Sequence, residues 1–193
     1  MVHLEEIYTL IMEVGKLRLV FRNTQVLPDR RESSAEHSWS VAMIIMTLMD
    51  DLRQEFGAID ELKTIKLGLI HDVVEIYAGD AFAFDEKARQ EKEKLEQEAM
   101  EKIVEIYPAF GRQLEKLWHE FEARETLEAK IAKGCDAMCA IFQRIRSQHS
   151  YTTRGIDMVR LDNLMLPYLS FSKTFMTMYA RLKADLVSGG LIF

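Results

Sequence analysis

Apolar residues recur every three or four positions along most of the 193-residue chain, which is the spacing of one buried face on each α-helix. Only three prolines and nine glycines interrupt this pattern, so we expect an all-α fold, a compact single-domain helical bundle. The pattern predicts helices over residues about 2–19, 34–56, 61–77, 85–107, 109–122, 125–147 and 157–188.

Local end signals support two of these helices and leave one stretch without regular structure. Ser33 and Glu36 have the spacing of a capping box, and an apolar run follows them. Asp60 is a suitable N-cap for the helix expected over 61–77. The stretch 22–33 is polar and contains a proline-aspartate turn signal, so we expect it to connect two helices.

Composition and charge indicate an ordinary globular protein. Hydrophobic residues make up 48% of the chain and charged residues 29%, and the length suits one domain over residues 1–193. The net charge of −6 argues against binding to a nucleic acid polymer or a membrane. Cys135 and Cys139 are four residues apart on a predicted helix, a separation that fits a disulfide poorly, so we expect two buried thiols. With no leader segment or long apolar span visible, we expect a cytoplasmic protein.

Four ionisable side chains are predicted to lie in apolar surroundings, where such groups are rare unless they are paired or bind a metal. His71 and Asp72 are adjacent in an apolar run, and Asp136 also has apolar neighbours. His37 falls in the first turns of the second predicted helix. Two histidines and two aspartates form a candidate mononuclear site for Mn²⁺, Co²⁺, Fe²⁺, Zn²⁺ or, less readily, Mg²⁺. The alternative for Asp136 is an ion pair with Lys133.

Further charged residues lie near these four in the sequence. Glu75 comes one helical turn after the His-Asp pair, so it can reach the site without being a ligand itself. Asp80 follows an alanine-glycine helix stop, where its side chain would face the mouth of a pocket. Arginines cluster at Arg22, Arg30 and Arg31, although a solvated loop is an equally good interpretation of the last two.

The candidate ligands resemble the H…HD…D signature of HD-domain metal-dependent phosphohydrolases. His37, the His71–Asp72 pair and Asp136 match the residue types, order and spacing of that signature. The resemblance implies an all-α fold in which these four side chains hold one divalent ion.

The strings around the ligands narrow the resemblance to one branch of that family. Residues 31–39 and 71–80 are similar to the branch that contains the bacterial 5′-deoxynucleotidases and HD-domain-containing protein 2. The resemblance extends over residues about 17–142, the expected metal-site core. The helices expected over about 157–188 would then complete the domain or form a dimer interface.

The resemblance also implies roles for the remaining candidates. In related enzymes the glutamate at the position of Glu75 assists proton transfer, and the aspartate at the position of Asp80 contacts the sugar. Arg22 is the best match to the arginine that holds the phosphate, with Arg30 or Arg31 in support.

We therefore expect a metal-dependent hydrolase that releases phosphate from a nucleoside or deoxynucleoside 5′-monophosphate. An HD phosphohydrolase acting on a triphosphate, an alarmone or a cyclic nucleotide is one alternative, and a non-catalytic nucleotide- or metal-binding module is another. Sugar selectivity stays open, because Asn23 follows Arg22 where the bacterial nucleotidases have a tryptophan.

A homodimer is the expected assembly. The C-terminal third carries more large apolar side chains than one short helical face needs, and large apolar patches usually mark partner surfaces. Related nucleotidases are similar in being dimeric. The alternative is that these residues cover the core of their own domain. The residues concerned are Met165, Leu166, Tyr168, Leu169, Phe171, Phe175, Met176, Met178 and Tyr179.

Overall fold

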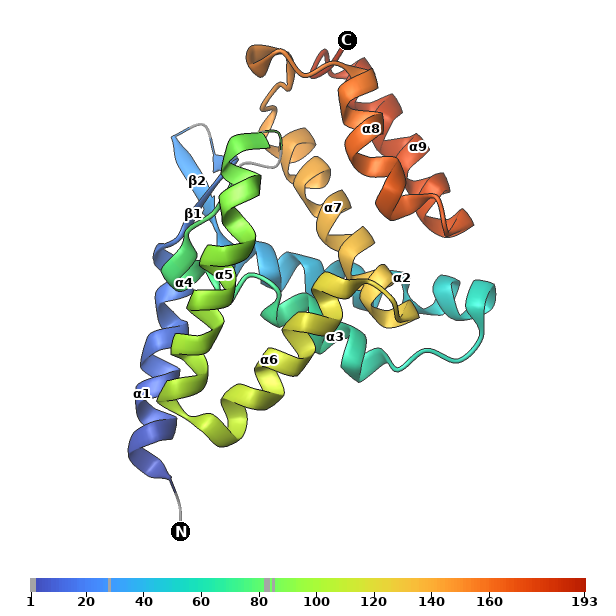
Figure 1. Ribbon diagram of the computed structural model, residues 1–193. Coiled ribbons are helices and arrows are strands. Elements are labelled where there is room, and N and C mark those ends of the chain that lie inside the picture. Colours follow the sequence, from blue (N-terminus) through green and yellow to red (C-terminus); the bar gives the residue numbers. More distant parts are fainter. Residues whose placement is uncertain (1–2, 28, 82–83, 85) are drawn as a thin grey trace.

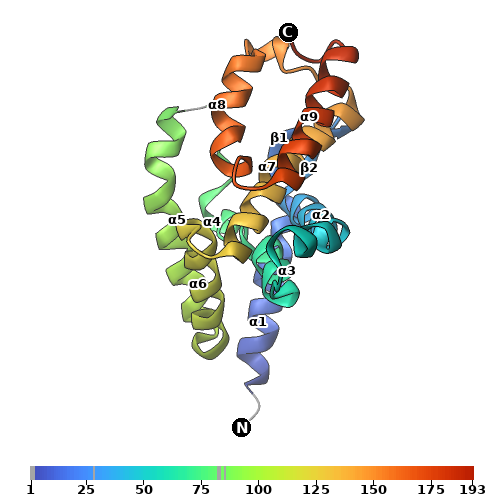
Figure 2. The same ribbon diagram turned by 90° about the vertical axis from the view of Figure 1, so that its right-hand side faces the viewer.

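The computed structural model describes residues 3–27, 29–81, 84 and 86–193, with only the backbone of 86–91 (Figures 1 and 2). Helices make up most of the described chain, so the all-α expectation is confirmed. The elements are α1 (Leu4–Val14), η1 (Gly15–Leu19), β1 (Phe21–Leu27), β2 (Arg30–Ser33), α2 (Ser34–Phe56), α3 (Glu61–Ile70), α4 (Glu75–Ala78), α5 (Glu86–Ile106), α6 (Pro108–Ala123), α7 (Leu127–Ser147), η2 (Thr152–Arg154), α8 (Met158–Leu169) and α9 (Lys173–Ser188).

The capping box predicted at the start of α2 is present. The Ser33 side chain accepts a hydrogen bond from the backbone N–H of Glu36 at 3.2 Å, and the Glu36 carboxylate accepts one from the backbone N–H of Ser33 at 2.9 Å. These two bonds satisfy backbone donors that would otherwise lack partners at the helix N-terminus. The first turns of α2 are therefore well defined, and they carry His37.

The polar stretch before α2 is a β-hairpin, so its interpretation as a connecting loop was wrong. Strands β1 and β2 form a two-stranded antiparallel sheet that packs against α7. The side-chain amide of Gln143 on α7 donates to the backbone carbonyl of Gln25 at 3.1 Å. The hairpin buries polar residues, including Thr24 and Glu32, so its sequence lacks the apolar alternation by which strands are recognised.

The helix expected over 61–77 is also interrupted. Helix α3 ends at Ile70, and residues 71–74 form a tight turn before α4. The backbone N–H of Val73 bonds to the carbonyl three residues back, at 2.9 Å, and that of Glu75 does the same at 3.0 Å. This tighter winding changes the directions in which the side chains of the turn point.

Two apolar clusters form the core, and the tight turn lies where they meet. The larger cluster draws mainly on α2, α3, α7, α8 and α9, and the smaller one on α1, α5 and α6. Val73 and Val74 of the turn belong to the smaller cluster. The His71 ring lies 4.9 Å from that of Phe121, which belongs to the larger cluster. The turn is therefore held from both sides.

The C-terminal helices cover the domain's own core. Helices α8 and α9 both pack against α7: they overlap beside it in Figure 1 and flank it in Figure 2. Leu169, Phe175 and Tyr179 are completely buried. Phe175 packs so closely on α7 that a side chain at Gly134 would collide with its ring. The apolar residues that motivated a homodimer are thus largely used within the chain. None of the helices within the described residues is long and apolar enough to cross a bilayer.

Candidate metal centre

The first expected ligand pair brings together α2 and α7. His37 is completely buried, and its Nε2 atom lies 2.9 Å from Oδ1 of Asp136, which is 99 residues further along the chain. The same Nε2 atom is 3.9 Å from Oδ2 of Asp72. Because α7 packs directly against α2, residues remote in sequence meet in one buried place.

The ring of His71 is oriented by its own helix. Its Nδ1 atom lies 2.9 Å from the backbone carbonyl oxygen of Gly68. A carbonyl oxygen only accepts hydrogen bonds, so Nδ1 is the donor here and Nε2 is the nitrogen that faces the two aspartates. The Nε2 atom is 3.1 Å from Oδ1 of Asp72 and 3.7 Å from Oδ1 of Asp136. An outer hydrogen bond of this kind is typical of metal-binding histidines.

The close approach of α3 to α2 makes this arrangement possible. A Cβ atom on Gly68 would lie 2.5 Å from Cδ1 of Ile45, so a larger residue at this point of the helix contact would force the Ile45 side chain to move. His71 follows one turn later and is thereby placed against the first turns of α2. The rings of His37 and His71 are 5.3 Å apart between centroids.

The four expected ligands fit a divalent metal ion. The ligand atoms of His37, His71 and Asp72 all lie within 4.8 Å of one another. Oδ1 of Asp136 lies within 3.7 Å of Nε2 of both histidines. The buried Nε2 of His71 makes no hydrogen bond to any described residue, which leaves it free for an ion. Two imidazoles and two carboxylates suit first-row transition metals.

Asp136 forms the expected ion pair as well as belonging to the cluster. Its Oδ2 atom accepts from Nζ of Lys133 at 2.9 Å, while its Oδ1 atom faces the histidines. Burial alone would raise the pKa of Asp136, but Lys133 and the histidines hold it well below its usual range. The two interpretations of Asp136 are therefore compatible, since each uses a different carboxylate oxygen.

Glu75 lies beside the cluster rather than in it. Its side chain, at the first residue of α4, is almost completely buried and accepts a hydrogen bond from Oγ of Ser34 at 2.6 Å. Burial raises the pKa of Glu75 well above its usual value, and the nearby Asp72 carboxylate adds to this effect. A carboxyl group with a raised pKa is suited to giving and taking protons.

Arg22 reaches the centre from β1 and faces three carboxylates. Its Nη1 atom donates to Oδ2 of Asp72 at 2.7 Å and lies 3.8 Å from Oδ1 of Asp80. Its Nε atom is 3.7 Å from Oε2 of Glu32. Burial alone would lower the pKa of this guanidinium, but the surrounding carboxylates, Asp72 first, raise it. Burial also raises the pKa of Asp80.

The structure does not bring Arg30 and Arg31 into the centre. Arg30 is exposed and pairs with the capping residue Glu36 at 2.8 Å. Arg31 donates at 2.6 Å to the backbone carbonyl oxygens of Phe21 and Arg22, so it holds the hairpin together. Neither side chain lines the cavity described below.

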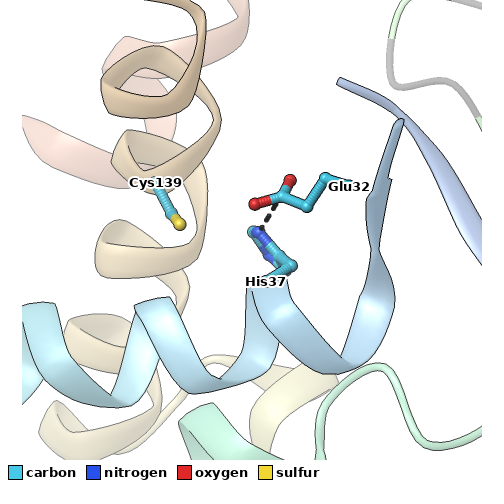
Figure 3. Close-up of side chains that lie close together, drawn as sticks. All are labelled: Glu32, His37 and Cys139. Atoms are coloured by element: carbon cyan, nitrogen blue, oxygen red, sulfur yellow. Dashed lines mark ion pairs between the residues drawn. The ribbon is translucent and has the colours of Figure 1, made fainter. Parts of the chain in front are cut away.

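Glu32 is a site residue that the sequence did not reveal. Its Oε2 atom lies 3.9 Å from Nδ1 of His37, on the side of the ring away from the other candidate ligands. Together with Sγ of Cys139, these atoms form a second cluster of possible metal-ligating side chains (Figure 3). Neither Nδ1 nor Oε2 has a hydrogen-bond partner among the described residues. Burial raises the pKa of Glu32 to about 7. A strand pattern of alternating apolar and polar residues could have predicted that Glu32 is buried, but this hairpin buries polar residues and lacks that pattern.

The open side of the centre faces a cavity of about 1050 Å³. Its walls come from β1, the residues around Asp80, and helices α5, α6, α7 and α8. The cavity connects the candidate metal ligands with the candidate proton-transfer and substrate-binding residues. The members among them that line it are Arg22, His71, Asp72, Glu75, Asp80 and Asp136.

Comparison with known families agrees with this geometry. The HD domain family model matches residues 14–165, which is most of the chain. The chain belongs to the HD domain family. The resemblance inferred from the ligand signature is thereby confirmed, and the match extends beyond the expected limit near residue 142 into α8.

Individual relatives of this HD domain protein point to the same branch. The 5′-deoxynucleotidase HDDC2 of Homo sapiens is 32% identical over 134 residues, which are 69% of this chain and 61% of the human protein. The protein of the same name in Dictyostelium discoideum is 35% identical over 137 residues, 67% of this chain and 70% of that protein. This chain thus spans less than two thirds of the length of the human relative.

A solved structure extends the similarity over the C-terminal helices. A predicted metal-dependent phosphohydrolase from Magnetospirillum magnetotacticum MS-1 superposes with a TM-score of 0.85 and 29% sequence identity. The superposition covers 98% of this chain and 95% of that one. The arrangement of α8 and α9 against the core is therefore shared with that protein.

We expect Asp72→Ala to lose bound metal, because the change removes a carboxylate ligand from a centre that has four. Metal content measured by plasma mass spectrometry, together with calorimetric titration of Mn²⁺, checks this. Asp50→Ala, at an exposed position of α2, is the matched control and should bind metal normally. Full metal occupancy in a correctly folded Asp72→Ala protein would contradict the assignment.

Proposed function

We propose that this protein is a divalent-metal-dependent phosphohydrolase that releases phosphate from nucleoside or deoxynucleoside 5′-monophosphates. The observation that carries the proposal is one cavity lined by three of the four candidate ligands, by the buried carboxyl group of Glu75 and by the guanidinium of Arg22. The relatives named 5′-deoxynucleotidase support a nucleotide 5′-phosphate as the reacting group.

The chain's own residues would divide the chemistry among them. A divalent ion held by His37, His71, Asp72 and Asp136 supplies Lewis-acid polarisation of the phosphoryl group and acidifies water. Arg22 offers paired N–H donors to phosphate oxygens. Glu75, whose pKa is raised by burial, would take a proton from the attacking water or deliver one to the leaving oxygen. Asp80 lies beside Arg22 and is placed to accept a hydrogen bond from a sugar hydroxyl.

The proposed substrates include both ribonucleotides and deoxyribonucleotides. Asn23, the neighbour of Arg22, lines the cavity, and an asparagine side chain is smaller than the tryptophan of the bacterial nucleotidases. The relatives' names favour the deoxy sugar. Asn23, however, lacks the bulk with which a tryptophan at this position could exclude the ribose 2′-hydroxyl. A cytoplasmic location is part of the proposal too, supported by two free, buried cysteines.

The experiment that tests the function is a turnover assay over a panel of nucleotides and metals. Purified protein is freed of metal, loaded separately with Mn²⁺, Co²⁺, Zn²⁺ or Mg²⁺, and given nucleoside mono-, di- and triphosphates, cyclic nucleotides and pyrophosphorylated nucleotides. The proposal is supported if inorganic phosphate is released from 5′-monophosphates and not from the other nucleotides. Release of pyrophosphate or triphosphate would favour the other HD activities, and binding without turnover would favour a non-catalytic module.

We expect Glu75→Gln to lower turnover roughly 10²–10⁴-fold while the metal stays bound, because an amide cannot exchange the proton. Steady-state kinetics and metal content, measured on the same preparation, check this. Glu105→Gln, an exposed position on α5, is the control. Loss of the ion from Glu75→Gln would instead make Glu75 a ligand.

Arg22→Ala is expected to reduce kcat/KM by about 10- to 100-fold, mainly through a higher KM, because charge-assisted hydrogen bonds to the phosphate are lost. Kinetics with a 5′-monophosphate check this, with metal content measured in parallel because Arg22 also contacts Asp72. Arg30→Ala on the same hairpin should behave like the unmodified protein. If Arg22→Ala has unchanged kinetics, phosphate is held elsewhere.

A homodimer stays a prediction, and the structure offers a further apolar surface for it on α2 and α7, next to Met178 of α9. Trp39, Met43 and Met46 are exposed at one-turn spacing on the outer face of α2, and Phe142 of α7 is partly exposed. Apolar side chains grouped in this way are typical of partner surfaces. Light scattering over a dilution series, with Met46→Glu as the disrupting variant, checks the dimer. A mass of 22.4 kDa at every concentration would contradict it.

A further inference from the structure

The cavity extends past the metal centre along α7. Asp136, Ala137, Ala140 and Arg144 all line it, in this order along the helix. An α-helix rises 1.5 Å per residue, so the backbone at Arg144 lies about 12 Å beyond that at Asp136. The small side chains of the two alanines leave room between these ends. The cavity is therefore larger than the phosphate group alone would need.

The far end of this cavity holds a buried arginine with an unused donor. Arg144 is 2% exposed, and its guanidinium carbon lies 4.3 Å from the centroid of the Tyr151 ring. Its Nη1 atom has no hydrogen-bond partner, and none of the described carboxylates forms an ion pair with it. A buried donor without a partner is costly, so this N–H calls for a partner such as a ligand or an ordered water.

The side chains that line the cavity next to Arg144 are aromatic and aliphatic, while Arg154 and Arg160 lie close by but are not part of its lining. Besides Tyr151 the lining includes Phe84, whose ring lies 6.4 Å from that of Tyr151, and Leu161 and Met165 of α8. A second phosphate would require several cations or backbone N–H groups around it. An aromatic and aliphatic slot with one polar group of fixed direction is instead typical of sites for planar heterocycles.

We propose that this base lobe, formed by Ala140, Arg144, Tyr151 and Leu161, binds the nucleobase of the substrate, and that Arg144 donates to a ring oxo group. The proposal deepens the proposed nucleotidase function and rests on it for the position of the phosphate. Asp80 lines the same cavity and lies 3.8 Å from Arg22, so the sugar would sit close to the phosphate in this arrangement.

The chemistry of the guanidinium defines which bases it favours. Arginine carries only donors, so it complements the oxo group at C6 of hypoxanthine or guanine and the neighbouring N7 acceptor. Adenine presents an amino group at C6, which is also a donor and leaves an arginine N–H unpaired. A site built around one hydrogen bond discriminates against a ligand that cannot make it.

The sharpest probe is a pair of substrates that differ at C6 of the purine, inosine and adenosine 5′-monophosphate, in both ribo and deoxy forms. We expect kcat/KM of the unmodified protein to favour the inosine nucleotide by roughly 10- to 100-fold. Arg144→Met should bring this ratio close to one, mainly by weakening the inosine nucleotide. Arg146→Met, two positions along and exposed, should keep the preference.

Equilibrium binding separates this inference from the proposed activity. Calorimetry with Mn²⁺-loaded Glu75→Gln protein, alone and combined with Arg144→Met, measures the same ratio without turnover. A preference that is present in binding and lost with Arg144→Met supports the base lobe even if no phosphate is released. If Arg144→Met fails to fold, Arg144→Lys, which keeps a donor but loses the planar fork, should show a reduced preference.

Three results with the two mononucleotides would overturn the base lobe. They are equal use and equal binding of the two nucleotides by the unmodified protein, a preference that survives Arg144→Met, and binding of neither nucleotide. A nucleoside 3′,5′-bisphosphate that gains over the 5′-monophosphate only when Arg144 is present would also overturn it, because Arg144 would then serve a second phosphate.

Discussion

A hydrogen bond of 2.9 Å between His71 Nδ1 and the Gly68 carbonyl oxygen ends α3 and organises the centre. In a continued α-helix that carbonyl would accept from the backbone N–H of Asp72 instead. The imidazole takes it, the chain winds more tightly, and His71 and Asp72 then face the same point. The same turn places Glu75 at the start of α4 and sends Val73 into the second apolar cluster. Local winding, ligand direction and core packing thus depend on one bond.

Charge balance is the second constraint on the site. Asp72 and Asp136 are kept ionised despite burial, since each faces histidine and one cation, Arg22 or Lys133 respectively, and the pKa of each carboxyl is lowered. Glu75 has a neutral hydroxyl as its hydrogen-bond partner, and its pKa is raised. The pKa values of neighbouring carboxyl groups are thereby shifted in opposite directions, which suits the proposed division into metal ligands and a proton carrier.

The C-terminal helices connect the stability of the fold to the shape of the site. Helix α8 packs on α7 and α9 through residues that are completely buried, such as Leu161 and Leu169. Leu161 and Met165 at the same time form a wall of the cavity that contains the metal centre. The C-terminal helices therefore help to set the size of the cavity, while the candidate ligand residues set its chemistry.

The sequence by itself determined the helical class, the capped start of α2 and the identity and order of the four candidate ligands. These follow from apolar periodicity, capping residues and charged groups in apolar runs, all of which act over a few residues. The tertiary structure alone decided the hairpin, the tight turn at His71 and the burial of Glu32 and Arg144. The hairpin buries polar residues and so breaks the rule that inward positions are apolar. Which charged side chain is buried depends on contacts between segments up to about a hundred residues apart, and no local pattern records them.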